Sequence, residues 1–221
     1  MSMSASASGR ESDLLQRLRA ARVIPVLRLA QRETAARALD LLIEAGFRTI
    51  ELTLTTPGAL ELVADLRQRT DPDFLVGAGT VLDLDSARAC IAAGADYLVS
   101  PCLVEGLAEL ARAHGRAALI GGFTPSEVRA AWLGGAAAVK VFPASSGGPS
   151  HLAAMHAVFP DIPLCPTGGV SLANMADYVK AGAAFVGVGN NVIDQSALAV
   201  RDDGAVVRHA RAFVDLAASL A

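Results

Sequence analysis

Residues 117–142 have the sequence AALIGGFTPSEVRAAWLGGAAAVKVF, in which one helical segment separates two short apolar runs. Thr124 precedes Pro125 and lies three residues before Glu127, a combination typical of a helix N-terminus with a capping box. Apolar runs that alternate with helical segments are typical of parallel strands covered by helices. This stretch therefore predicts one strand–helix–strand unit.

The same alternation extends over nearly the whole chain. It predicts eight strands, at residues 23–29, 49–55, 74–80, 97–101, 117–121, 138–142, 163–166 and 184–188. Helices are expected at residues 33–45, 57–69, 83–93, 103–114, 125–133, 149–159 and 172–181, with two more at 11–21 and 202–220. Eight units in 221 residues favour a single (β/α)8 TIM barrel with its active site at the C-terminal ends of the strands. A doubly wound sheet is the alternative, but eight strands would make it unusually wide.

Composition narrows the class of protein. The 19 basic and 22 acidic residues give a net charge of −3, which offers no electrostatic reason to expect nucleic acid as a partner. No apolar run reaches 18 residues, so no membrane span is expected. Residues 1–10 lack the apolar region of a secretion signal and are expected to be disordered, with residues 11–221 forming one domain. The three cysteines form no C-x-x-C pair, which favours a reducing cytoplasm.

Only two lysines occur in the chain, and one stands in an apolar strand. Lys180 lies at the end of a predicted helix, where a cation complements the helix dipole. Lys140 lies in AAAVKVFP, residues 136–143, where a buried ammonium group is costly unless it is paired or deprotonated. In general, lowering a lysine pKa from about 10.4 to about 7 costs about 4 kcal/mol and makes half of the amines neutral. Lys140 is therefore a candidate Schiff-base nucleophile; the alternative is a lysine that pairs with a carboxylate or reaches water.

The predicted strand TIELTLT, residues 49–55, has one polar and one apolar face. The polar face carries Thr49, Glu51, Thr53 and Thr55. In a barrel the apolar face packs against helices, so Glu51 is expected to point into the interior together with Lys140. A carboxylate there can serve as a general acid and base; the alternative is a counter-ion for Lys140 or Arg28.

Two further polar side chains are expected at strand ends. Arg28 has the parity of Ile24 and Val26, which favours an inward guanidinium suited to a carboxylate; a surface position past the strand is equally compatible. Thr80 follows Gly-Ala-Gly at 77–79 and offers a hydroxyl. This Gly-Ala-Gly lacks the third glycine of a dinucleotide fingerprint, so a nicotinamide cofactor is not expected.

Glycine-rich loops follow predicted strands seven and eight, as PTGGVS at residues 166–171 and GVGNN at 187–191. In many barrels these two loops bind phosphate through backbone N–H groups. The candidate phosphate contacts are Gly168, Gly169, Gly189, Asn190 and Asn191. The four histidines show no ligand spacing, so no metal is expected.

Taken together, these motifs resemble the class I 2-keto-3-deoxy-6-phosphogluconate (KDPG) aldolase family. The resemblance rests on VKVFPA around Lys140, IELTL around Glu51, GAGTVL at 77–82, Ser100-Pro101 and CPTGGV at 165–170, and it covers nearly the whole chain after residue 11. It implies a cytoplasmic carbon–carbon lyase, typically a homotrimer without a cofactor. Such an enzyme cleaves a phosphorylated keto-deoxy sugar acid into pyruvate and glyceraldehyde 3-phosphate.

The resemblance also implies roles for individual residues. Lys140 forms the Schiff base and Glu51 shuttles protons. Thr80 and Pro101 line the pocket of the pyruvyl group, and Phe142 packs beside the imine. The loops after strands seven and eight hold the phosphate.

Several positions depart from the family pattern. Thr55 stands where these aldolases usually carry an arginine, and Arg28 resembles the phosphogalactonate aldolase branch instead. Thr167 resembles the phosphogluconate branch, so both C4 epimers are candidate substrates. Cys102 stands where glycine is common and is expected to narrow the pocket. Asn191 stands roughly where a serine often binds phosphate, so phosphate affinity is expected to be weaker.

Two other functions are compatible with the motifs. In a sugar-phosphate epimerase or decarboxylase barrel, Lys140 would act only as an electrostatic clamp. In a non-catalytic barrel that binds sugar phosphates, Lys140 and Glu51 would form a structural pair.

Overall fold

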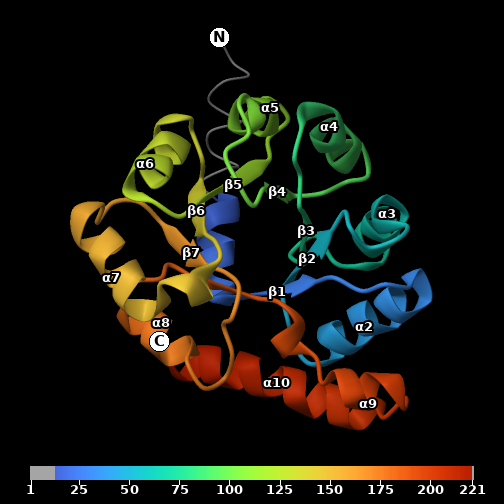
Figure 1. The fold of residues 1–221 in the computed structure, drawn as a ribbon. Coiled ribbons are helices and arrows are strands. Elements are labelled where there is room, and N and C mark those ends of the chain that lie inside the picture. Colours follow the sequence, from blue (N-terminus) through green and yellow to red (C-terminus); the bar gives the residue numbers. More distant parts are fainter. Residues whose placement is uncertain (1–12, 221) are drawn as a thin grey trace.

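Eight parallel strands form one sheet in the order β7-β6-β5-β4-β3-β2-β1-β8, which curls into a barrel (Figure 1). The computed structural model describes residues 13–220. The strands are β1 (Val23–Leu27), β2 (Thr49–Thr53), β3 (Leu75–Gly79), β4 (Tyr97–Val99), β5 (Ala117–Gly122), β6 (Ala138–Val141), β7 (Leu164–Pro166) and β8 (Val186–Val188). Two isolated bridges, Leu164 with Ala183 and Thr167 with Gly187, join the remaining edges. The predicted (β/α)8 barrel is therefore confirmed, and the open doubly wound sheet is excluded.

Helices surround the barrel and alternate with the strands (Figure 1). They are α2 (Arg32–Glu44), α3 (Ala59–Arg69), α4 (Leu84–Ala92), α5 (Leu107–Ala113), α6 (Pro125–Leu133), α7 (Gly148–Val158), α8 (Met175–Lys180), α9 (Gln195–Ala199) and α10 (Asp203–Ser219). Residues 13–21 are also helical and form the predicted additional N-terminal helix. The segment 1–10, predicted to be disordered, lies outside the described residues.

Element boundaries show where the sequence patterns mislead. The short helix α9 and the 3-10 turns η1 (Ala144–Ser146) and η2 (Asn190–Val192) are not predicted, because three to five residues are too few to show a helical period. Strand β2 ends at Thr53 and not at residue 55, because its register with β3 ends where Thr53 pairs with Gly79. Helix α5 begins at Leu107 and not at residue 103, after Gly106 in the left-handed conformation.

The predicted start of the helix at residue 57, just after Thr56, is wrong. Helix α3 begins at Ala59, and Gly58, with a φ of 68°, is its N-cap residue. The Thr56 hydroxyl instead accepts a hydrogen bond from the Leu29 amide at 3.3 Å, which ties the loop after β1 to the loop after β2. By contrast, the capping box of Thr124 and Glu127 at the start of α6 is confirmed.

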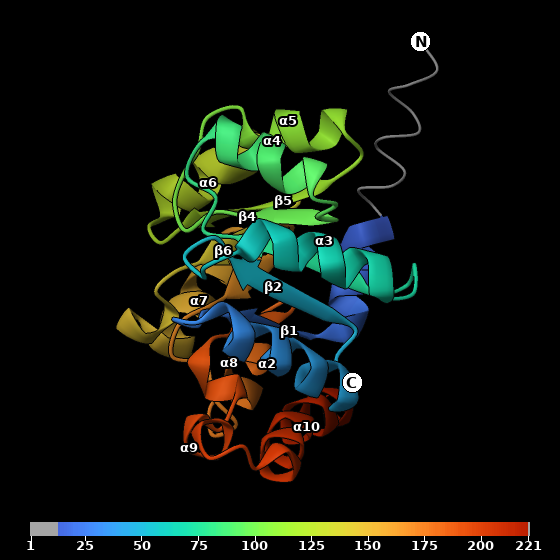
Figure 2. The ribbon, with the colours of Figure 1, turned by 90° about the vertical axis from the view of Figure 1, so that its right-hand side faces the viewer.

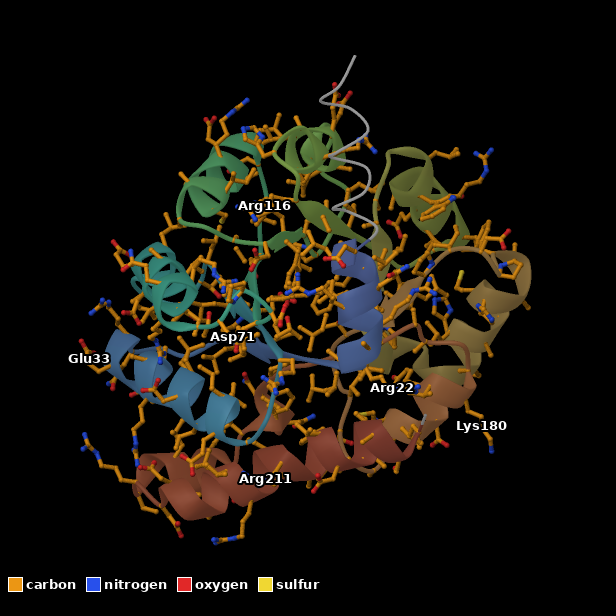
Figure 3. All side chains as sticks on the ribbon, turned by 180° about the vertical axis from the view of Figure 1, so that it is seen from behind. Arg22, Glu33, Asp71, Arg116, Lys180 and Arg211 are labelled. Carbon is orange, nitrogen blue, oxygen red and sulfur yellow. The ribbon has the colours of Figure 1, made fainter. Side chains whose placement is uncertain are left out.

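Apolar side chains form two separate cores. Ile50 and Leu52 of β2 belong to the larger core between the strands and the outer helices. The smaller core fills the barrel and includes Leu14 and Leu18 of helix 13–21. Figure 2 shows this helix at the end of the barrel where β2 starts, and Figure 3 shows it from behind, in blue, at the centre of that face. The N-terminal end of the barrel is therefore plugged, which leaves the C-terminal end for a site.

Candidate active site

Lys140 and Glu51 meet inside the barrel. Lys140 lies on β6 and Glu51 on β2, and the two side chains project inward from different sides of the barrel. Lys140 Nζ donates to Glu51 Oε1 at 3.4 Å, and the two residues are only 6% and 3% exposed. Each charge would be costly to bury alone, so the pair compensates both. Lys180, in contrast, is exposed in the last turn of α8, as predicted.

Two glycines of β3 make room for this pair and its surroundings. A Cβ atom at position 79 would overlap the Glu51 carboxylate, and one at position 77 would overlap the Tyr97 ring. The Tyr97 hydroxyl shares a 2.8 Å hydrogen bond with the Thr49 hydroxyl. Burial, reinforced by the negative charge of Glu51, raises the pKa of Tyr97 well above its usual value, so it is a neutral phenol. The Gly-Ala-Gly motif therefore serves packing around Glu51, which the sequence alone does not reveal.

A cavity of about 170 Å³ opens at the C-terminal ends of the strands, with Lys140 in its wall. It is lined by residues from every strand or following loop except that of β5: Val26, Arg28, Thr53, Thr80, Pro101, Lys140, Phe142, Thr167, Gly168, Gly189 and Asn190. Larger hollows lie elsewhere on the surface, including one near Arg22 and Arg48 at the plugged end, but the buried lysine–carboxylate pair is not among their lining residues.

Arg28 and Thr80 lie together at the edge of this cavity. Arg28 Nη2 is 3.5 Å from Thr80 Oγ1, a distance at the outer limit of a hydrogen bond. Thr80 has a φ of 62°, a conformation that a β-branched residue adopts at a cost of about 1–3 kcal/mol. Strain of this kind is concentrated at functional sites. The structure thus supplies a second reason, beyond the motif, to place Thr80 in the site.

Other residues singled out in the sequence lie around Lys140. Lys140 Nζ is 5.6 Å from the centroid of the Phe142 ring. The hydroxyl of Thr167, a buried residue, lies 3.7 Å from Cys165 Sγ. Cys165 of β7 is paired with Lys140 of β6 in the sheet. Burial raises the pKa of the Cys165 thiol to about 12, so this thiol is not an ionised nucleophile. Cys102 is exposed and is not a lining residue, so the structure does not show the narrowing expected from it.

Besides Glu51, three of the candidate residues do not line the cavity, and two unpredicted residues, Val26 and Thr53, do. Thr55 is exposed and shares a 3.0 Å hydrogen bond with the Thr53 hydroxyl. Gly169 and Asn191 belong to the predicted loops but are not lining residues either. Thr53 itself lines the cavity, and its parity with Glu51 on β2 is the signal that identifies it.

The loops after β7 and β8 contain unbonded backbone amides. Gly168 and Gly169 have φ values of 92° and 82°, which turn the chain sharply. Within residues 13–220, the amides of residues 168–170 and 189–191 have no hydrogen-bond acceptor. Amides gathered in this way bind anions.

The described residues contain neither a metal-binding cluster nor a membrane-spanning helix. Among residues 13–220, no three His, Cys, Asp or Glu side chains come together in a group able to hold a metal ion. No described helix has the length and apolarity needed to cross a membrane.

A buried amine that contacts a carboxylate at the mouth of a (β/α)8 barrel is the arrangement that a Schiff-base enzyme requires. The family model for KDPG and KHG aldolases matches residues 14–209, so the chain belongs to this family of aldolases, which are carbon–carbon lyases. The predicted family and enzyme class are thereby confirmed.

Individual relatives agree with this assignment. A 2-dehydro-3-deoxy-phosphogluconate aldolase of Pseudomonas aeruginosa is 38% identical over 162 residues, 73% of each chain. A probable 2-dehydro-3-deoxy-6-phosphogalactonate aldolase of Rhizobium meliloti is 36% identical over 171 residues, 77% of this chain and 81% of the relative. A Legionella pneumophila KDPG aldolase, crystallised with pyruvate captured as a covalent carbinolamine, superposes with a TM-score of 0.81 at 30% identity over 90% of this chain and 96% of that one.

Proposed function

We propose that this protein is a class I aldolase that cleaves KDPG into pyruvate and glyceraldehyde 3-phosphate through an imine on Lys140. The observation that carries the proposal is the buried contact between Lys140 Nζ and Glu51 Oε1, 3.4 Å apart, beside a cavity. The P. aeruginosa relative carries the name of this activity. The L. pneumophila structure supports covalent chemistry with pyruvate in the same fold.

The proposed reaction begins with proton transfer from the Lys140 ammonium to Glu51, which frees the amine to attack the C2 ketone. Glu51 donates this proton to the hydroxyl group of the carbinolamine, so that water leaves, a cationic imine forms and the Glu51 carboxylate is restored. Glu51, acting through a water molecule, then removes the proton of the C4 hydroxyl while the C3–C4 electron pair moves into the imine and forms an enamine. Glyceraldehyde 3-phosphate leaves, C3 is protonated, and hydrolysis of the imine releases pyruvate and restores Lys140.

The cavity supplies groups for the rest of the substrate. Arg28 is suited to the substrate carboxylate because it is the arginine that lines the cavity, and Thr80 lies beside it. Pro101 and Phe142 enclose the pyruvyl part. The unbonded amides after β7 and β8 hold the phosphate. Thr55 takes no part in this assignment, since it lies outside the cavity lining.

The galactonate epimer is the second candidate substrate, because the R. meliloti relative carries that name and Arg28 lies in the cavity. Pyruvate release from the two C4 epimers, followed with lactate dehydrogenase, distinguishes them. Membership in an aldolase family favours both over an epimerase, a decarboxylase or a non-catalytic barrel. Turnover that stops on addition of a chelator, or ligand binding without pyruvate release, would instead support these other functions.

Borohydride trapping tests the mechanism directly. Sodium borohydride added with pyruvate is expected to fix a pyruvyl adduct on Lys140, identified by peptide mass spectrometry. The exposed Lys180 is an internal control. An adduct on Lys180, or no adduct, contradicts the proposal.

We further propose a cytoplasmic homotrimer that needs no metal or organic cofactor. Three unpaired cysteines fit a reducing compartment. Light scattering should give three times the chain mass of 22.7 kDa, and activity should persist in a chelator.

A further inference from the structure

The phosphate site, whose assignment rests on the proposed function, is held in shape by hydrogen bonds to the loop after β7. The loop after β7 has its carbonyl groups occupied by donors from outside the loop. Thr167 O accepts from Ala144 N at 2.8 Å, Gly168 O from Ser145 N at 2.9 Å, and Gly169 O from Asn174 Nδ2 at 3.0 Å.

These three bonds determine where the loop amides point. In a planar trans peptide the C=O group and the following N–H group point in opposite directions. Fixing the carbonyls of residues 167–169 therefore turns the amides of residues 168–170 away from η1 and from Asn174. The same three amides have no acceptor in residues 13–220; Gly168 lines the cavity and Gly169 is exposed, whereas Val170 is fully buried. The amides of Gly168 and Gly169 are thus held ready for an anion, and the bond to Gly169 O fixes the end of the turn that carries them.

Of the three donors to these carbonyl groups, Asn174 alone donates from its side chain; the other two donors are backbone amides. It lies at the N-cap position of α8 and contacts the loop at two points. Its Nδ2 donates to Gly169 O, and its Oδ1 accepts from Ser171 N at 2.8 Å. Without this contact, the peptide between Gly169 and Val170 is free to rotate, because glycine adopts many backbone conformations.

Asn191 connects the two phosphate loops. Its Nδ2 donates to Val170 O at 2.9 Å, and its own carbonyl lies 2.8 Å from His209 Nε2 of α10. This side chain is already engaged and does not line the cavity, whereas Asn190 does.

We propose that Asn174 is a positioning residue that orients the phosphate-binding loop, and that the Asn191 side chain braces the two loops and is not a phosphate ligand. The phosphate site is then made by the backbone, and its geometry is set by two side-chain amides outside the cavity lining.

The test is Asn174→Asp, which preserves the size of the side chain and one acceptor oxygen but replaces the donor to Gly169 O. The matched control, Ala173→Asp, adds the same charge at an exposed neighbouring position.

In Asn174→Asp, the dissociation constant of inorganic phosphate, followed by amide NMR shifts, is expected to rise about tenfold. The KM for KDPG is expected to rise by the same factor. Exchange of the pyruvate methyl protons into deuterated water and borohydride trapping with pyruvate should change less than about twofold. The control should alter phosphate affinity less than about threefold.

Equal losses in phosphate binding and pyruvate exchange would show a general structural role and overturn the proposal, as would unchanged phosphate binding. Asn174→Ser, whose side chain is too short to reach Gly169 O, serves if the aspartate variant does not fold. Asn191→Leu should weaken phosphate binding less than Asn174→Asp does. A larger loss of phosphate affinity in Asn191→Leu would indicate that the Asn191 side chain is itself a phosphate ligand and would contradict the proposal. Phosphate titration requires no turnover, so a wild-type protein without a pyruvate adduct would refute the proposed function separately.

Discussion

At the C-terminal end of the barrel, Lys140 and Glu51 are buried charges beside a cavity, and Thr80 is held in a strained conformation. At the N-terminal end, Leu14 and Leu18 close the interior with apolar contacts. One end therefore retains groups that lower stability unless they are paired, while the other end stabilises the fold. In this barrel, function and stability are therefore carried by opposite ends.

The largest effect is expected for Lys140→Met. Pyruvate release should fall below detection, because the imine has no nitrogen on which to form. The variant also leaves the Glu51 carboxylate buried without its partner, which typically destabilises a protein by about 3–5 kcal/mol. Combining Lys140→Met with Glu51→Leu should recover stability in urea unfolding but no activity. A double variant no more stable than Lys140→Met alone would contradict the view that the unpaired Glu51 carboxylate causes the loss of stability.

Glu51→Gln separates proton transfer from imine formation. The side chain keeps its shape and its place against Gly79 but loses its basicity. Turnover should fall about 10²- to 10⁴-fold, the usual contribution of a general acid or base. Borohydride trapping of pyruvate on Lys140 should still succeed after longer incubation. Turnover within a few fold of wild type would show that Glu51 is only a counter-ion.

The same division explains what the sequence could and could not predict. Periodicity revealed the strand β2, the inward parity of Glu51 and the apolar environment of Lys140, because buried strands have a simple pattern. It did not reveal that Gly79 admits the Glu51 carboxylate, since contacts between strands depend on register. It also placed the start of a helix at residue 57, directly after Thr56, although the Thr56 hydroxyl accepts a hydrogen bond from the Leu29 amide of another loop. Local signals identify elements, whereas the site is assembled by non-local contacts.

Leu18→Ala tests the plugged end. Leu18 is fully buried in the inner core, and removing such a side chain typically costs about 2–5 kcal/mol. The free energy of unfolding in urea should fall by this amount, while kcat and KM measured well below the melting temperature should stay within about twofold. An exposed residue of the same helix, Arg19, provides the control, because Arg19→Ala should change stability by less than about 0.5 kcal/mol. A loss of activity in folded Leu18→Ala would show that the two ends are coupled.

The smallest effect is expected at the capping box of α6. Thr124→Ala removes a side-chain cap and should lower the free energy of unfolding by about 1 kcal/mol at pH 7 without changing kcat.

Hydrogen bonds from the backbone amides of Thr124 and Phe123 and from the Thr124 hydroxyl lower the pKa of Glu127. Because the folded-state pKa is the lower one, this stabilisation is complete above the unfolded-state pKa and is lost as the pH falls through the folded-state value. Glu127→Gln keeps an amide oxygen as acceptor but cannot titrate. Its free energy of unfolding should therefore rise relative to that of wild type as the pH falls below about 4. Urea unfolding of the two proteins between neutral and acidic pH measures this difference; parallel curves would show that the Glu127 carboxylate does not contribute to the cap.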